Sequence, residues 1–178
     1  MKTFDRIIIA FILSVLTAST TAAQFRNTGR LNTWTVRAVA RNHEGAGTTY
    51  VRSVRAGRHP TFDRVVFEFA GSMPNYRVEY LRGRSYENEG GRQRIKIAGN
   101  AFVQVNLNLI PTDEEQMRLR EQDSFMPKGR LKFRSVWELD EAGLFEGYYD
   151  FLLGIRARRQ FRVSELSNPL RLVIDFKN

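Results

Sequence analysis

The sequence predicts an all-β protein, an antiparallel β-sandwich of about nine short strands with at most one short helix. Short segments alternate apolar and polar residues with the two-residue period of a half-buried strand. Glycine, proline and asparagine interrupt these segments at intervals of roughly ten residues. A length of 178 residues with 42% hydrophobic residues allows one domain with a single core. A closed barrel would produce the same pattern.

The clearest strand covers residues 64–70, where Val65, Phe67 and Phe69 point to one face of the predicted sheet. The same order of arginine, apolar residue, valine, apolar residue, acid and phenylalanine returns in residues 171–176. This repetition predicts either two pseudo-symmetric halves or two central strands that pair with each other, although such strings also recur by chance in β proteins.

Further alternating segments predict the remaining strands, at residues 33–40, 48–55, 76–81, 94–98, 101–109, 131–139, 145–155 and 161–166. Residues 71–75 are rich in turn formers, so the strands on either side of them are predicted to form an antiparallel hairpin. Residues 83–93 are polar and glycine-rich and predict a flexible loop. Residues 112–122 predict the one helix, because Thr112 can cap it and Glu115 follows three residues later.

The composition narrows the chemistry that the chain can perform. Its net charge is +9, and most of its basic residues are arginine. This balance favours anionic partners, although alternate positions of exposed strands must be polar in any case. With no cysteine there is no disulfide, thiol nucleophile or zinc–thiolate site, and only His43 and His59 could supply an imidazole. The sequence therefore predicts no metal site and no cofactor.

Residues 1–23 have the features of a secretory signal peptide. A basic start is followed by an apolar run at residues 7–16, which is too short to span a bilayer comfortably, and small residues precede Gln24. We predict cleavage after Ala23, with an uncleaved membrane anchor as the alternative. The predicted location is secreted or periplasmic, in the cell envelope. Export argues against a nucleic-acid partner, and signal cleavage would leave no stable membrane span.

Two sets of motifs resemble the AMIN-like domain family. The first is VRAGRHPTFDRVVFEF at residues 54–69 with PNYRVEY at residues 74–80, and the second includes LSNPLRLVIDF at residues 166–176. The resemblance runs from about Val51 to Phe176. It implies an exported bacterial β-sandwich related to the AMIN domains of wall-cleaving N-acetylmuramoyl-L-alanine amidases and pilus secretins, which localise those proteins at peptidoglycan. It supplies no catalytic residue.

The resemblance divides the chain after the signal peptide into two parts. Residues 24–47 are predicted to be an N-terminal leader with the first strand, and residues 48–178 to be the AMIN-like β-sandwich domain. The polar stretch at residues 83–93 and the charged stretch at residues 111–128 depart from the family pattern, and either could alter a binding surface.

Two basic segments supply the candidate ligand-binding residues, which are Arg58, His59, Arg156, Arg158, Arg159 and Arg162. The first two lie in a turn before the clearest strand, and loops on rigid scaffolds often carry function, although a turn histidine with a fixed hydrogen bond is the more ordinary interpretation. The other four form the densest basic cluster. If residues 155–163 stay extended, Arg156, Arg158 and Arg162 share one face and could grip phosphates or carboxylates. The alternative is a basic turn that only aids solubility.

The sequence does not predict catalysis. Asp63, Glu68, Glu146 and Asp175 are the acids that a hydrolase would need as a pair. Glu68 and Asp175 occupy equivalent positions of the two similar strands, and each is expected to pair with an arginine of a neighbouring strand. The predicted function is a non-catalytic binding module of the bacterial envelope that contacts peptidoglycan or an anionic wall polymer. A wall-modifying hydrolase and a membrane-tethered or self-associating structural subunit are the alternatives.

Overall fold

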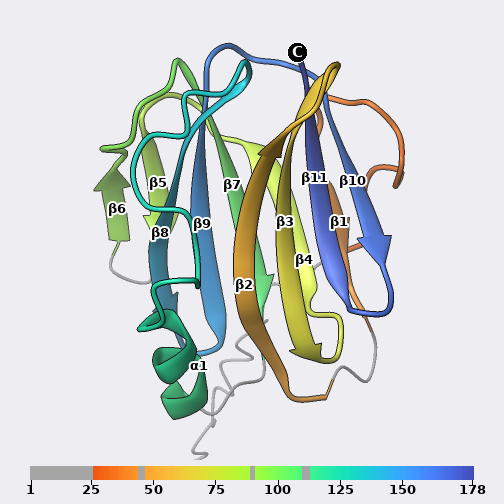
Figure 1. The fold of residues 1–178 in the computed structure, drawn as a ribbon, viewed down its shortest axis with the longest axis vertical. Helices are drawn as coiled ribbons and strands as arrows, with labels where there is room; N and C mark the ends of the chain where they lie inside the picture. The colour runs from red at the N-terminus through yellow and green to blue at the C-terminus, as the bar shows by residue number, and fades with distance from the viewer. Residues whose placement is uncertain (1–25, 44–46, 89–90, 110–112) are drawn as a thin grey trace, which may run out of the picture.

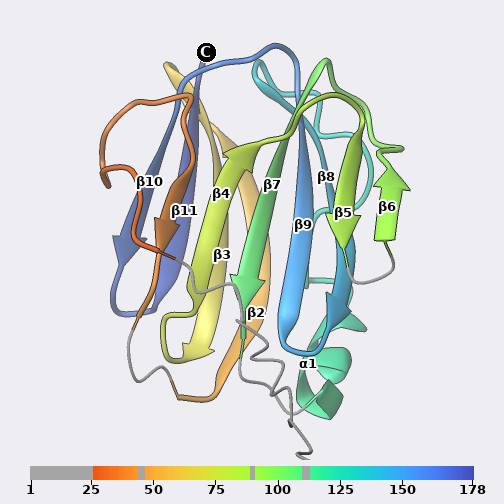
Figure 2. The same ribbon diagram turned by 180° about the vertical axis from the view of Figure 1, so that it is seen from behind.

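Two antiparallel sheets pack face to face in the computed structural model, which describes residues 26–43, 47–88, 91–109 and 113–178 (Figures 1 and 2). The five-stranded sheet contains, in spatial order, β1 (Val39–Arg41), β4 (Asn75–Tyr80), β7 (Ala101–Asn108), β9 (Tyr148–Ile155) and β8 (Val136–Phe145). The four-stranded sheet contains β10 (Phe161–Leu166), β11 (Arg171–Lys177), β3 (Phe62–Gly71) and β2 (Thr49–Arg58). The predicted antiparallel sandwich is confirmed.

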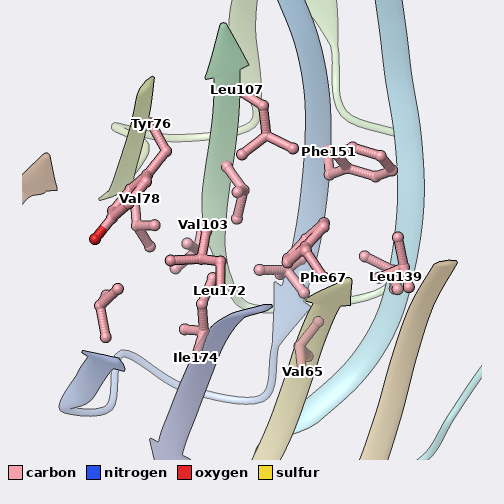
Figure 3. Packing of buried hydrophobic residues seen from close by; sticks show 14 of the residues in the cluster. Val65, Phe67, Tyr76, Val78, Val103, Leu107, Leu139, Phe151, Leu172 and Ile174 are labelled. Carbon is pink, nitrogen blue, oxygen red and sulfur yellow. The ribbon is translucent and has the colours of Figure 1, made fainter. Parts of the chain in front are cut away.

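The core lies between the two sheets and follows the two-residue period of the strands. Val65, Phe67 and Phe69 of β3 point inward and are each at most 3% exposed. The ring of Phe67 meets that of Phe151 edge-on from the facing sheet, with centroids 5.0 Å apart (Figure 3). The predicted inward face of this strand is therefore confirmed.

The two similar strands, β3 and β11, are the central pair of the four-stranded sheet. They run antiparallel, so that Asp175 lies opposite Arg64 and Arg171 opposite Glu68. Each strand carries its acid four residues after its arginine, and antiparallel pairing therefore places an arginine opposite an acid at both ends. Of the two predicted explanations for the repetition, pairing of two central strands is confirmed.

The predicted hairpin across residues 71–75 is wrong, because β3 and β4 belong to different sheets. Strand β3 pairs with β2 and β11, whereas β4 pairs with β1 and β7. Gly71 has a φ of 87°, and a side chain there would collide with the carbonyl oxygen of Thr48. The turn formers thus carry the chain from one sheet to the other instead of folding it back on itself.

The segment before β2 also differs from its prediction. The strand expected at residues 33–40 is shortened to β1 because Thr35 pairs with Phe161 of the four-stranded sheet, whereas Val39 pairs with Val78 of the five-stranded sheet. One continuous strand cannot serve both sheets. The segment crosses the edge of the sandwich instead.

The boundaries of three further predicted segments differ in the structure. Residues 83–93, predicted as a loop, contain the strand β5 (Ser85–Asn88) and most of its partner β6 (Gly91–Arg94). Residues 94–98 form no strand beyond Arg94, although Ile95 and Ile97 are buried in a second apolar cluster with Phe102 and Leu152. The strands expected at residues 131–139 and 145–155 are β8 and β9. A two-residue turn with positive φ joins them.

The predicted helix is present as α1 (Asp113–Arg120), beside β2 (Figure 1). The proposed cap, Thr112, lies outside the described residues. The described parts of the chain contain no helix with the length and apolarity needed to cross a membrane.

A basic depression at one end of the sandwich

Three loop segments and the end of the chain meet at one end of the sandwich, where β11 finishes (Figure 1). They surround an open depression of about 620 Å³, lined by Pro60, Thr61, Arg134, Arg156, Arg159, Lys177 and Asn178. Of the seven side chains, four are cationic and none is acidic. The depression is therefore a site of positive charge built from segments far apart in the sequence.

Asp63 fixes the framework beneath this depression. Its carboxylate is fully buried, and Oδ2 accepts hydrogen bonds from the backbone N–H groups of Ser135, at 2.5 Å, and Val136, at 3.0 Å. The hydroxyl of Ser135 donates to the carbonyl of Lys177 at 2.8 Å, and the carbonyl of Ser135 accepts from the N–H of Arg156 at 2.8 Å. One buried acid thus ties together the backbone of three segments that carry cations.

The chain end holds the turn between β2 and β3 from the other side. The side-chain amide of Asn178 donates to the carbonyl of His59 at 3.2 Å, and its backbone N–H donates to the carbonyl of Thr61 at 3.0 Å. Arg134 Nη1 donates to the carbonyl of Pro60 at 3.2 Å. These bonds hold the backbone that carries the cations in a fixed arrangement.

The predicted cluster of four arginines is divided by the structure. Strand β9 ends at Ile155 and β10 begins at Phe161, so the intervening residues bend and the expectation of one shared strand face is wrong. Arg156 and Arg159 line the depression. Arg158 turns away: its guanidinium lies 4.5 Å from the ring centre of Tyr80 and donates to the carbonyl of Val36 at 3.3 Å.

Arg162 has a place in the outer face of the four-stranded sheet. Its Nε donates to Asp175 Oδ2 at 2.8 Å, and its guanidinium lies over the rings of Trp34, at 4.7 Å, and Phe62, at 5.3 Å. Arg64 binds the same carboxylate through two bonds of 2.6 and 2.9 Å. Its hydrogen bonds to Asp175 raise the pKa of Arg64, while burial opposes that rise.

Arg58 and His59 stand beside the depression without lining it. The guanidinium of Arg58 lies 5.8 Å from the ring centre of Phe133. The imidazole of His59 stacks on Phe62 at 4.4 Å, and its backbone N–H donates to the carbonyl of Phe62 at 2.8 Å. The turn contributes its next two residues, Pro60 and Thr61, to the lining instead.

Sequence reasoning missed five of the seven lining residues: Pro60, Thr61, Arg134, Lys177 and Asn178. Arg134 ends a stretch of alternating basic residues at positions 128–134, which could have pointed to it, whereas Lys177 has no basic neighbour and local composition carried no signal for it. The hydrogen bonds around Ser135 bring these residues together, and they depend on a long-range contact.

Three of the four acids that a hydrolase could pair are engaged elsewhere, and the fourth, Glu146, is exposed in the turn between β8 and β9. Asp63 binds backbone N–H groups, Glu68 accepts from Arg55 at 2.7 Å, and Asp175 accepts from two arginines. The expectation that Glu68 and Asp175 pair with arginines of neighbouring strands is confirmed. Among the residues that the structure describes, no group of three or more histidine, cysteine or acidic side chains could hold a metal ion.

Fold and site together define a class of protein: an antiparallel β-sandwich domain with a basic recess at one end. A family model of the AMIN-like domain matches residues 49–178, which include every strand except β1. The chain therefore belongs to the AMIN-like domain family, as its two sets of motifs predicted. Neither the curated proteins nor the solved structures compared with the chain gave a match.

Proposed function

We propose that the protein is an exported, non-catalytic binding module of the bacterial cell envelope, and that it holds anionic groups of peptidoglycan or of a wall polymer in the basic depression. Family membership supports the association with the wall. The observation that carries the proposal is the convergence of Arg134, Arg156, Arg159 and Lys177 on one depression whose described lining includes no acidic side chain.

The chemistry of the lining suits carboxylates and phosphates. A guanidinium presents a planar fork of N–H donors that can hold two oxygens of an anion at once, which an ammonium cannot copy. Arg156 and Arg159 are both exposed, so they do not have to leave a buried partner before they bind a ligand. The hydrolase alternative has less support, because Asp63, Glu68 and Asp175 already serve structural bonds.

Sedimentation with purified wall sacculi tests the proposal. The double variant Arg156→Gln/Arg159→Gln should bind about tenfold more weakly or worse, a loss of roughly 1.4 kcal/mol or more. Its fold should be retained, because neither side chain is buried. Sacculi stripped of attached anionic polymers show whether the binding groups belong to peptidoglycan itself or to the attached polymer.

A matched control separates this site from general electrostatic attraction. Arg94→Gln/Arg158→Gln removes the same charge from exposed arginines that do not line the depression, one of them within the same loop. It should bind almost as tightly as the wild type. Equal losses of sacculus affinity in both double variants, or no loss in Arg156→Gln/Arg159→Gln, would contradict the proposed site. Release of soluble wall fragments during the assay would contradict the non-catalytic role.

A further inference from the structure

The outer face of the four-stranded sheet is also basic, and it adjoins the depression. In β11, Leu172, Ile174 and Phe176 fill the core, so Arg171, Asp175 and Lys177 point outward by the alternation of the strand. Neighbouring strands add Arg55, Arg64 and Arg162, which share this outward register.

The two acids of this face lie beneath its arginines, and its five cations outnumber them. The side chain of Asp175 is 1% exposed and is held by Arg64 and Arg162, whose side chains are 32% and 30% exposed. The side chain of Glu68 is 17% exposed and is bound by Arg55, which is 57% exposed. The acids therefore orient the arginines from below, while the cations meet the solvent.

The cations follow one another along the strands. Residues that face outward and lie opposite each other across the strands form four rows. The first row contains Lys177 opposite Phe62, and the second contains Arg162, Asp175 and Arg64. The third row contains Arg55, and the fourth contains Arg171. Successive rows are about 7 Å apart, because each spans two residues of a strand, and the whole run covers roughly 20 Å. Lys177 also lines the depression, so the two basic surfaces are continuous.

We infer that the depression and this sheet face together bind one linear polyanion, a flexible chain of repeated phosphate or carboxylate groups. The inference rests on the proposed function and makes it more specific: the ligand carries charges at intervals and occupies several rows, whereas a single anionic group would use the depression alone. The face matches such a chain in charge and in direction, since each of the four rows along the strands contributes at least one cation, from β10, β11, β3 or β2.

A flexible chain fits better than a flat anionic membrane. The depression lies at the strand ends between the two sheets, and the basic face lies along the side of one sheet. The two surfaces therefore meet at an edge, which Lys177 occupies. A flexible polymer can follow both surfaces around that edge, but a planar bilayer can contact only one of them at a time.

Binding of phosphate chains of two lengths to the exported protein tests the inference. Tripolyphosphate is short enough for the depression alone, whereas long-chain polyphosphate can reach the far rows. Wild-type protein should bind the long chain at least tenfold more tightly than the short one. Arg55→Gln/Arg171→Gln, which changes the far rows only, should lose most of that advantage and bind tripolyphosphate unchanged. It should also reduce the dependence of long-chain affinity on salt, because fewer counterions are released.

Two controls separate this inference from the proposed function. Arg156→Gln/Arg159→Gln should weaken both probes, and Arg94→Gln/Arg158→Gln should weaken neither by more than about twofold. Equal affinity for both chain lengths, or an unchanged long-chain affinity in Arg55→Gln/Arg171→Gln, would overturn the extended site and leave the depression intact. Tighter binding to phosphatidylglycerol vesicles than to long-chain polyphosphate would overturn it in favour of a membrane. Thermal unfolding of each variant verifies that the fold is retained.

Discussion

At the scale of single residues, Asp150 is the least expected acid of the structure. It points outward from β9 but is only 6% exposed, and its Oδ1 accepts hydrogen bonds from Gln104 at 2.9 Å and Asn106 at 2.7 Å. Burial raises the pKa of Asp150 above its ordinary value of 3.8, and the two amide donors only partly oppose that rise. Folding therefore disfavours the ionised form of this carboxyl group.

This shift gives the stability of the protein a defined pH dependence. A carboxyl group whose pKa is higher in the folded state contributes its stabilisation below the unfolded pKa of 3.8 and loses it as the pH rises through the folded pKa. Asp150→Asn removes the buried charge but keeps an acceptor for both amides. The variant should be at least as stable as the wild type near neutral pH. The difference between their free energies of unfolding should shrink as the pH falls through the folded pKa of Asp150 towards 3.8.

Denaturant unfolding of both proteins over a series of pH values measures this difference. Gln93→Asn, in β6 of the two-stranded sheet, changes an amide that carries no charge at any pH, so its effect should not vary with pH. A constant difference between Asp150→Asn and the wild type at every pH would show that the pKa of Asp150 is not raised by folding.

Some residue roles could be predicted from sequence, and others could not. The pairing of Asp175 with Arg64 followed from the repeated pattern, because equal spacing of arginine and acid on antiparallel strands places them opposite each other. The partner of Glu68 did not follow from it, because Glu68 is bound by Arg55 of β2 although Arg171 lies opposite. The lining of the depression did not follow. Arg134 and Lys177 reach it only because buried Asp63 fixes Ser135, and a sequence pattern does not show which distant backbone a buried acid will bind.

At the scale of elements, α1 protects the free edge of β2. Gln116 is fully buried: its Oε1 accepts from the N–H of Val51 at 2.8 Å, and its Nε2 donates to the carbonyl of the same residue at 3.1 Å. The carbonyl of Phe125 accepts from the N–H of Val54 at 2.6 Å. The helix and the segment after it thus occupy hydrogen-bonding positions that a further strand would use, and they shield an edge that could otherwise pair with another chain.

Replacing Gln116 by methionine tests this role without opening a large cavity. Methionine has a similar length but leaves the N–H and the carbonyl of Val51 unpaired, and each buried unsatisfied group costs about 1–3 kcal/mol. We expect the free energy of unfolding to fall by roughly that amount or more. Light scattering should reveal association of the variant as its concentration increases. Met117→Ala is the control on the same helix, because Met117 is 47% exposed and its replacement should change both quantities little.

Unchanged stability and an unchanged monomer–oligomer balance in Gln116→Met would show that water replaces the amide at this edge. The element itself was predictable, since residues 112–122 carried the one helical composition, but its role was not. Alternation along a strand shows which face is buried, and it does not show which edge is free. The same limit explains the mistaken hairpin between β3 and β4, because both strands alternate correctly and only their partners differ.

At the scale of the whole molecule, the segment before β2 holds the two sheets together. In β1, Val39 and Ala40 are fully buried, and this strand pairs with β4 of the five-stranded sheet. A few residues earlier, Asn32 donates its backbone N–H to the carbonyl of Val163 in the four-stranded sheet at 2.8 Å. The described part of the predicted leader is therefore bound to both sheets, although the family match begins only at residue 49.

The folding unit should accordingly be larger than the segment that matches the family. A chain that begins at Thr48 loses the burial of Val39, about 1.5–3 kcal/mol, together with several backbone hydrogen bonds of about 1 kcal/mol each. It should be less stable than a chain that begins at Gln24 by at least about 3 kcal/mol, with its denaturant midpoint lowered to match. A chain that begins at Gln24 and carries Val36→Ala is the control, because Val36 is 39% exposed and its loss should matter little. Equal denaturant midpoints for the two chain lengths would show that residues 26–43 do not contribute to the stability of the sandwich.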